Sequence, residues 1–107
     1  MTCYSEVLGN LIFQYGKEIK KQEEMEHNCR KKKDRLIYRE NINILKDRLE
    51  CLKTLIEYLA GSISDRRKIK ETLDILQTII DVENDLQEYY NAAALECLMK
   101  DLKCILY

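Results

Sequence analysis

Apolar residues recur at alternating steps of three and four between Ile42 and Leu59. The positions are Ile42, Leu45, Leu49, Leu52, Ile56 and Leu59. This alternation keeps side chains on one face of an α-helix, as in the seam of a coiled coil. Tyr38, Cys51 and Leu55 widen the stripe on one side. A wide stripe suits a helix that packs against two neighbours, so we predict a buried helix over residues 36–60.

A turn follows this helix in the segment "AGSISD", residues 60–65. Gly61 suits the left-handed position after a helix end, and Ser62 or Ser64 can cap the next helix. Because the connection is short, we expect the helices on either side of it to be antiparallel neighbours.

A third helix is predicted near residues 64–104. Its first stripe holds Ile69, Leu73, Leu76 and Ile80, and Ile75, Ile79, Val82 and Leu86 form a second stripe beside it. Beyond Asn84 the apolar pattern shifts, and Asn91 is followed by three alanines. This shift indicates either a continuous or kinked helix, which we favour, or a new helix that starts at Asn91.

The first helix is predicted near residues 3–30. Leu8, Leu11, Ile12, Tyr15 and Ile19 form its apolar face, but the seam turns polar at Gln22 and Glu26. No Gly or Pro marks its end, so Asn28 and Asp34 bracket the expected connection. If no turn forms there, the first two helices merge into one rod that needs a second copy to bury it.

Composition supports an all-α fold in one domain, residues 1–107. The chain has no Pro, only three Gly, 46% apolar and 35% charged residues, and it lacks the turn signals that strands need. We therefore expect an elongated antiparallel three-helix bundle. Its predicted core comprises Ile42, Leu45, Leu49, Leu52, Ile56, Leu59, Leu73, Leu76 and Ile80.

Charge and cysteine content limit the classes of protein to which the chain can belong. A formal net charge of -1 gives no global field to hold nucleic acid or an anionic membrane, and no apolar run is long enough to span a bilayer. Five cysteines without a signal peptide or a Cys-x-x-Cys pair favour reduced, mostly buried thiols over disulfides or zinc. We expect a cytoplasmic protein, as a monomer or homodimer, with no metal or cofactor.

Candidate chemistry is sparse. His27 is the one histidine and stands among charged residues without a triad or metal-site pattern, so we interpret it as a surface residue and predict that the protein is not an enzyme. The run "RKKKDR", residues 30–35, is either a solvated helix end or a surface that attracts an acidic partner segment. Tyr89 and Tyr90 cannot both face the same side of a helix, so one of them is expected in the core and the other on the surface.

Two segments of the chain resemble the tubulin-binding cofactor A family. In the first helix the resemblance is carried by Tyr15, Lys17, Glu18, Lys20, Gln22, Glu23 and Glu24. In the third, "LDILQTIIDVENDLQEY" from Leu73 to Tyr89 carries it through Gln77, Ile79, Asp81, Glu83, Asp85, Leu86 and Glu88. Tyr38 resembles the tyrosine that opens the family's second helix.

This resemblance implies a small helical chaperone that captures β-tubulin through its helical faces, without nucleotide or metal, in association with the cytoskeleton. The candidate partner-binding residues are Lys17, Lys20, Lys21, Glu23, Glu24, Arg30, Lys31, Lys32, Lys33, Glu83, Asp85 and Tyr90. The alternative hypotheses are a structural or adaptor bundle that serves as an interaction module in a larger assembly, and a small helical inhibitor.

Overall fold

The computed structural model of the chain describes residues 4–61 and 66–106, and these residues form four α-helices and no strands. The helices are α1 (Tyr4–Asn28), α2 (Lys32–Leu59), α3 (Arg66–Asp85) and α4 (Tyr89–Leu106). The all-α prediction is therefore confirmed. The predicted three-helix bundle is wrong, because the segment expected as one third helix forms two.

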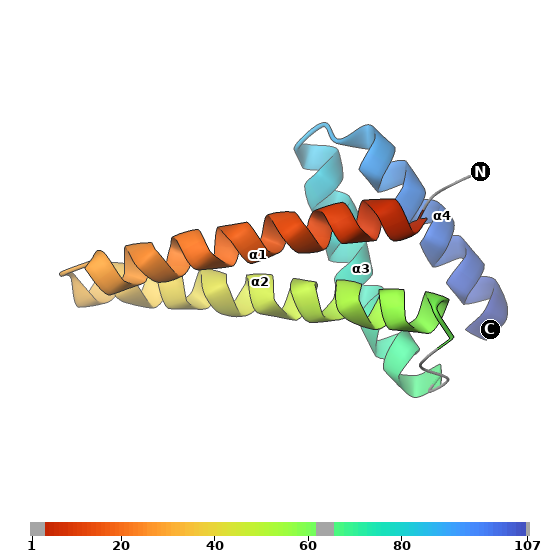
Figure 1. The fold of residues 1–107 in the computed structure, drawn as a ribbon, viewed down its shortest axis with the longest axis horizontal. Coiled ribbons are helices and arrows are strands. Elements are labelled where there is room, and N and C mark those ends of the chain that lie inside the picture. The colour runs from red at the N-terminus through yellow and green to blue at the C-terminus, as the bar shows by residue number, and fades with distance from the viewer. Residues whose placement is uncertain (1–3, 62–65, 107) are drawn as a thin grey trace.

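The four helices are arranged as two crossed pairs (Figure 1). The long helices α1 and α2 lie side by side, and α3 crosses this pair steeply before the chain returns as α4. The helices α2 and α3 are neighbours, as predicted, but the prediction that they run antiparallel is wrong, because they cross steeply. A short connection fixes only that two helix ends lie close together, whereas the packing of side-chain ridges sets the crossing angle.

The molecule is elongated, with principal extents of 48 × 29 × 19 Å. One end of the α1–α2 pair lies over α3 and α4, while the other end projects well beyond them as a two-helix arm (Figure 1). We call residues 16–46, which form this arm, the tip. Within the tip only Ile19 and Ile42 are buried apolar residues, so its two helices have little core of their own.

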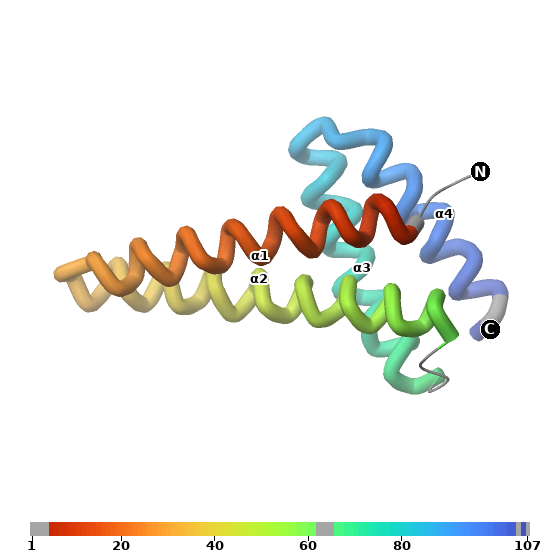
Figure 2. The backbone as a smooth tube through the Cα atoms, in the orientation of Figure 1, coloured from red at the N-terminus to blue at the C-terminus, as the bar shows by residue number. Residues whose placement is uncertain are grey.

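The break between α3 and α4 is a Schellman motif. Gln87 adopts a left-handed conformation with a φ of 63°, its N–H donates to the carbonyl of Asn84, and the N–H of Glu88 donates to the carbonyl of Glu83 over 2.8 Å. These two bonds satisfy carbonyls that the helix end leaves free. The backbone then turns back on itself (Figure 2). Glycine or asparagine usually holds this left-handed position. Because Gln87 holds it here, the sequence favoured a kinked helix over the alternative of a new helix, which the structure shows from Tyr89.

The other connections match the sequence better. Residues 29–31 join α1 to α2, within the predicted interval, and Gly61 takes the expected left-handed conformation after α2 with a φ of 78°. The N–H of Gly61 donates to the carbonyl of Tyr58. The predicted caps Ser62 and Ser64 lie outside the described residues.

The main core lies where the two pairs cross. Its fully buried side chains include Leu8, Leu11, Leu52, Leu55, Ile69, Leu76, Ile79, Ile80, Leu95, Leu98 and Leu102. Of the predicted core, Ile42, Leu52, Leu73, Leu76 and Ile80 are buried, whereas Leu45, Leu49 and Ile56 are half-buried. Leu59 is 40% exposed. Its predicted burial is wrong because it stands in the last turn of α2, where no third antiparallel helix runs alongside.

The cysteines are less uniform than predicted. Cys51 is buried between α2 and α3, and its thiol donates to the carbonyl of Thr72 over 3.5 Å. Cys29 is half-buried, and Cys97 and Cys104 are exposed. The expectation that most thiols are buried is therefore wrong for the described cysteines, while Cys3 lies outside them.

Burial raises the pKa of the Cys51 thiol to about 12. A thiol whose pKa lies that far above neutral pH forms almost no reactive thiolate. We predict that an alkylating reagent at pH 8 modifies Cys97 and Cys104 in the native protein, and that Cys51 reacts only after unfolding. Peptide mass mapping after timed alkylation measures this. Labelling of Cys51 at the rate of Cys97 would contradict the packing of α2 on α3.

Candidate functional site

The tip of the α1–α2 pair carries the most concentrated group of charged side chains that the sequence singled out. Arg30 and Lys31 stand in the connection, and Lys32 and Lys33 stand in the first turn of α2, all of them exposed. Lys31 is the N-cap residue of α2, and its side chain makes no capping hydrogen bond. Cations at a helix N-terminus oppose the helix dipole, so this end of α2 favours an added anion.

A surface groove of about 630 Å³ runs along one side of the tip. Its lining consists of Glu23, Glu26 and His27 from α1 and Lys32, Arg35, Leu36 and Arg39 from α2. We call it the tip groove. It therefore combines cations, two carboxylates and an exposed apolar side chain, Leu36, at the junction of two helices.

One ion pair crosses the tip groove. The Arg39 guanidinium donates to Oε1 of Glu26 over 2.5 Å and ties α2 to α1. Within the described part of the chain, no carboxylate lies within ion-pair distance of Lys32 or Arg35. Two cations of the groove are therefore available to an outside carboxylate, while the third holds the groove together.

The predicted site residues of α1 lie along the same arm but on different sides. Lys17, Lys20, Lys21, Glu23 and Glu24 are all exposed. Only Glu23 lines the tip groove. The ammonium of Lys17 lies 5.4 Å from the centre of the Phe13 ring, which gives it a cation–π contact within the helix.

The predicted residues of the third helix do not join this group. Asp85 and Tyr90 are exposed on either side of the α3–α4 break. Tyr89 is exposed as well, so the prediction that one of the two tyrosines lies in the core is wrong. Glu83 is only 3% exposed, and its burial is incompatible with the direct surface contact that the sequence assigned to it. The sequence pattern placed Glu83 on the surface because this residue lies within the segment "VEND", residues 82–85, which resembles a solvated face.

Glu83 instead belongs to a buried polar cluster where α1, α2 and α3 meet the start of α4. Burial and the nearby Glu88 carboxylate raise the pKa of Glu83, although a hydrogen bond with Asn91 opposes the shift. Burial likewise raises the pKa of Tyr15, which hydrogen-bonds to Arg48. This cluster lines a small hollow of about 230 Å³ between Leu11, Leu45 and Leu86.

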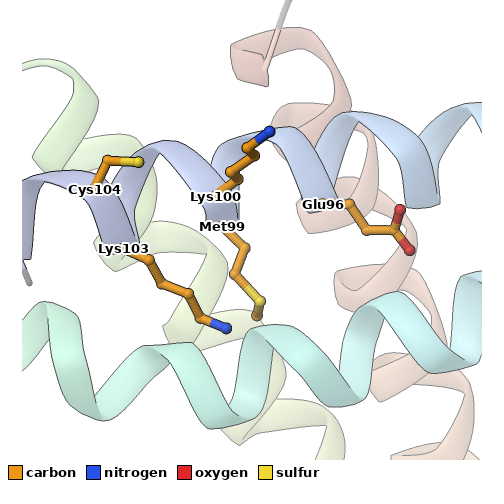
Figure 3. A pocket seen from close by; sticks show the side chains of 5 residues that line it. All are labelled: Glu96, Met99, Lys100, Lys103 and Cys104. Atoms are coloured by element: carbon orange, nitrogen blue, oxygen red, sulfur yellow. The ribbon is translucent and has the colours of Figure 1, made fainter.

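A separate hollow of about 390 Å³ runs along α4. Its lining consists of Glu96, Met99, Lys100, Lys103 and Cys104, all from this one helix (Figure 3). Met99 points toward α3, whereas Lys100 points to the other side of α4. Because the polar groups do not converge on one point, this surface offers no defined ligand position.

Other chemistry has little to build on in residues 4–61 and 66–106. No group of three or more His, Cys, Asp or Glu side chains among them is placed to hold a metal ion. No helix of this part of the chain is long and apolar enough to cross a membrane. Comparisons with protein families, curated proteins and solved structures found no match.

Proposed function

We propose that this chain is a non-catalytic protein-interaction module whose tip groove binds an acidic segment of a partner protein. The observation that carries the proposal is the pair of cations, Lys32 and Arg35, that line the groove beside the exposed Leu36 without an ion-pair partner among the described residues. Arginine in particular forms two parallel hydrogen bonds with a carboxylate. The matching ligand is a peptide with carboxylates on either side of an apolar residue.

The two-helix arm supports the same proposal. It projects beyond the crossing core, which makes both of its helices accessible to a large partner. The cations at the start of α2 interact unfavourably with the helix dipole, and an anion that binds nearby would offset this interaction. Charge of this kind increases association rate and selectivity more than affinity.

β-Tubulin is the specific partner that the resemblance of α1 and α3 to the tubulin-binding cofactor A family suggests, and it would place the protein in the cytoplasm with the cytoskeleton. The alternative is an adaptor bundle in a larger assembly, which uses the same groove on another acidic partner. The two hypotheses differ in the partner and agree on the chemistry of the tip groove.

The test is fluorescence anisotropy with two probes, a labelled peptide of alternating Glu and Leu and labelled, dissociated β-tubulin. We expect both probes to bind. The double substitution Lys32→Glu and Arg35→Glu, which reverses both charges, should raise Kd about 10- to 100-fold. Binding should also weaken as salt rises above about 0.15 M, where the screening length falls below about 8 Å.

The matched control is Lys100→Glu with Lys103→Glu on α4, which makes the same change in net charge far from the tip. Equal loss of binding in both double variants would show that only net charge matters and would reject the groove. Peptide binding without tubulin binding would favour the adaptor. Reversal of Lys17, Lys20, Lys21, Glu23 and Glu24 then tests whether the rest of α1 contributes to tubulin capture.

A further inference from the structure

The charges of the chain are divided between two regions, although its net charge is only -1. Residues 30–39, around the connection between α1 and α2, include six Lys or Arg residues and one Asp. Residues 71–99, which run from α3 into α4, include seven Asp or Glu residues and no Lys, Arg or His. The basic region belongs to the tip, which extends away from α3 and α4 (Figure 1). One molecule therefore carries a positive and a negative region that lie apart.

The turn between α3 and α4 is the most exposed part of the negative region. We call residues 85–90, which form this turn, the acidic corner. All six of them are exposed, and Leu86, Tyr89 and Tyr90 are 65%, 62% and 70% exposed. Large apolar and aromatic side chains that gather at one exposed place are typical of an interaction surface.

The carboxylates of the acidic corner are available to an outside cation. Asp85 and Glu88 lie on either side of Leu86 in the sequence. Within residues 4–61 and 66–106, no Lys or Arg lies within ion-pair distance of either carboxylate. The Schellman motif already fixes the backbone of this turn, since the N–H of Glu88 donates to the carbonyl of Glu83. Binding at the corner therefore costs little further backbone order.

The acidic corner has the composition that the tip groove calls for in a ligand. The groove presents Lys32 and Arg35 beside Leu36, which is 61% exposed. The corner presents two carboxylates around Leu86, which is exposed to a similar degree. Each surface thus combines an apolar leucine with two charges, of opposite sign on the two surfaces, that have no ion-pair partner in the described chain.

We propose that the tip groove of one copy binds the acidic corner of a second copy of this chain. The inference rests on the proposed function of the tip groove and names one partner for it. Because the two surfaces differ, the contact is heterologous. Two copies that exchange both contacts form a closed pair, and copies that add one after another form a chain.

Charge and size indicate a weak contact that depends on salt. The six residues of the acidic corner are few beside the roughly 20–30 residues per side of a standard stable interface. Opposite charges increase the association rate, and salt above about 0.15 M screens them within about 8 Å. We therefore expect a micromolar Kd at low salt and much weaker association at high salt.

Analytical ultracentrifugation of the full chain from about 1 to 300 µM, at about 0.03 M and about 0.5 M salt, tests the contact. We expect the wild type to form dimers or larger species as its concentration rises at low salt, and to dissociate at high salt. The groove variant, Lys32→Glu with Arg35→Glu, should raise Kd at least 10-fold. The corner variant, Asp85→Lys with Glu88→Lys, should do the same.

Two control variants make the same changes in net charge at other exposed positions. Lys100→Glu with Lys103→Glu matches the groove variant, and Glu50→Lys with Glu57→Lys matches the corner variant. Both controls should associate with a Kd within about 3-fold of the wild type, because long-range effects of net charge are weak beside direct ion pairs.

The decisive variant carries the groove and the corner substitutions in one chain. Its net charge returns to that of the wild type, because the two changes cancel. Its groove is acidic and its corner is basic, so the two surfaces again complement each other. Its Kd should fall back toward the wild-type value, at least 5-fold below that of either double variant, as expected for charges that interact directly.

The acidic peptide of alternating Glu and Leu should compete with self-association, because it occupies the same groove. Circular dichroism checks that each variant keeps its helices. If the corner variant does not fold, Asp85→Asn with Glu88→Gln replaces it and should also raise Kd.

Three results would overturn the proposal: a wild type that stays monomeric to 300 µM at low salt, a groove or corner variant that associates like its control, or a combined variant no tighter than the double variants. A wild type that binds the acidic peptide yet stays monomeric would reject this contact and keep the proposed function. A wild type that binds neither the peptide nor a second copy would reject both.

Discussion

Replacement of Leu52 by alanine is expected to lower the free energy of unfolding by about 2–5 kcal/mol. Leu52 is 0% exposed and belongs to the main core where the two helix pairs cross. Removing its branched end takes away buried apolar contacts and leaves a cavity that rigid helices fill only in part. Urea denaturation followed by circular dichroism measures the change, and the melting temperature should fall by roughly 10 °C or more.

Leu59→Ala is the matched control. It makes the same chemical change on the same helix, at a position that shares the sequence stripe of Leu52 but is 40% exposed. Its effect should stay within about 1 kcal/mol. If Leu59→Ala cost as much as Leu52→Ala, α2 would pack along its whole length as in the predicted three-helix bundle, and the crossed arrangement would be wrong.

This pair of variants reflects what the sequence predicts well and what it does not. Apolar spacing located α1 and α2, and it identified Leu52, Leu76 and Ile80 as core because a stripe of such residues needs a covering partner. Spacing does not determine the crossing angle of that partner. The buried half of the stripe around Leu52 and its exposed end at Leu59 therefore look alike in the sequence.

The sequence left open whether the chain breaks between α3 and α4, for a different reason. A helix end that uses a left-handed residue is usually marked by glycine or asparagine, and here Gln87 takes that conformation. The available signals were the shift of the apolar pattern after Asn84 and the cap candidate Asn91 before three alanines. A shift of phase is equally compatible with a kink, so the pattern alone could not decide.

The candidate site was predicted in part. The run from Arg30 to Arg35 is visible as a charge cluster, and Lys32 and Arg35 do line the tip groove. The groove itself depends on side chains from two helices, including Arg39, whose pairing with Glu26 joins positions 13 residues apart. The burial of Glu83 does not follow from local sequence, because it depends on where α3 crosses the pair.

The titration of Glu83 should contribute stability at acid pH that is lost as the pH rises toward neutral. Burial raises the pKa of Glu83 above the ordinary glutamate value, and Glu88 adds to the shift. The folded state therefore holds a proton that the unfolded chain releases near pH 4.3. In the window from about pH 4.3 up to the raised pKa, the folded state binds more protons, so the contribution of Glu83 to stability falls as pH rises.

Glu83→Gln removes this titration and keeps an oxygen that can accept from Asn91. We expect the variant to be more stable than the wild type by about 1 kcal/mol at pH 7, because it no longer buries a charge, and to lose this advantage near pH 4, where Glu83 is protonated. Urea denaturation of both proteins from pH 4 to pH 8 measures the difference at each pH, which cancels the titration of groups common to both.

The control is Glu96→Gln, which neutralises an exposed carboxylate on α4 and should give a small difference that hardly changes with pH. A Glu83→Gln variant that is less stable than the wild type at pH 7 would mean that the hydrogen bond between Asn91 and the charged carboxylate outweighs the cost of burial. A difference that does not vary with pH would mean that Glu83 is solvated, and that α4 does not close over the end of α3.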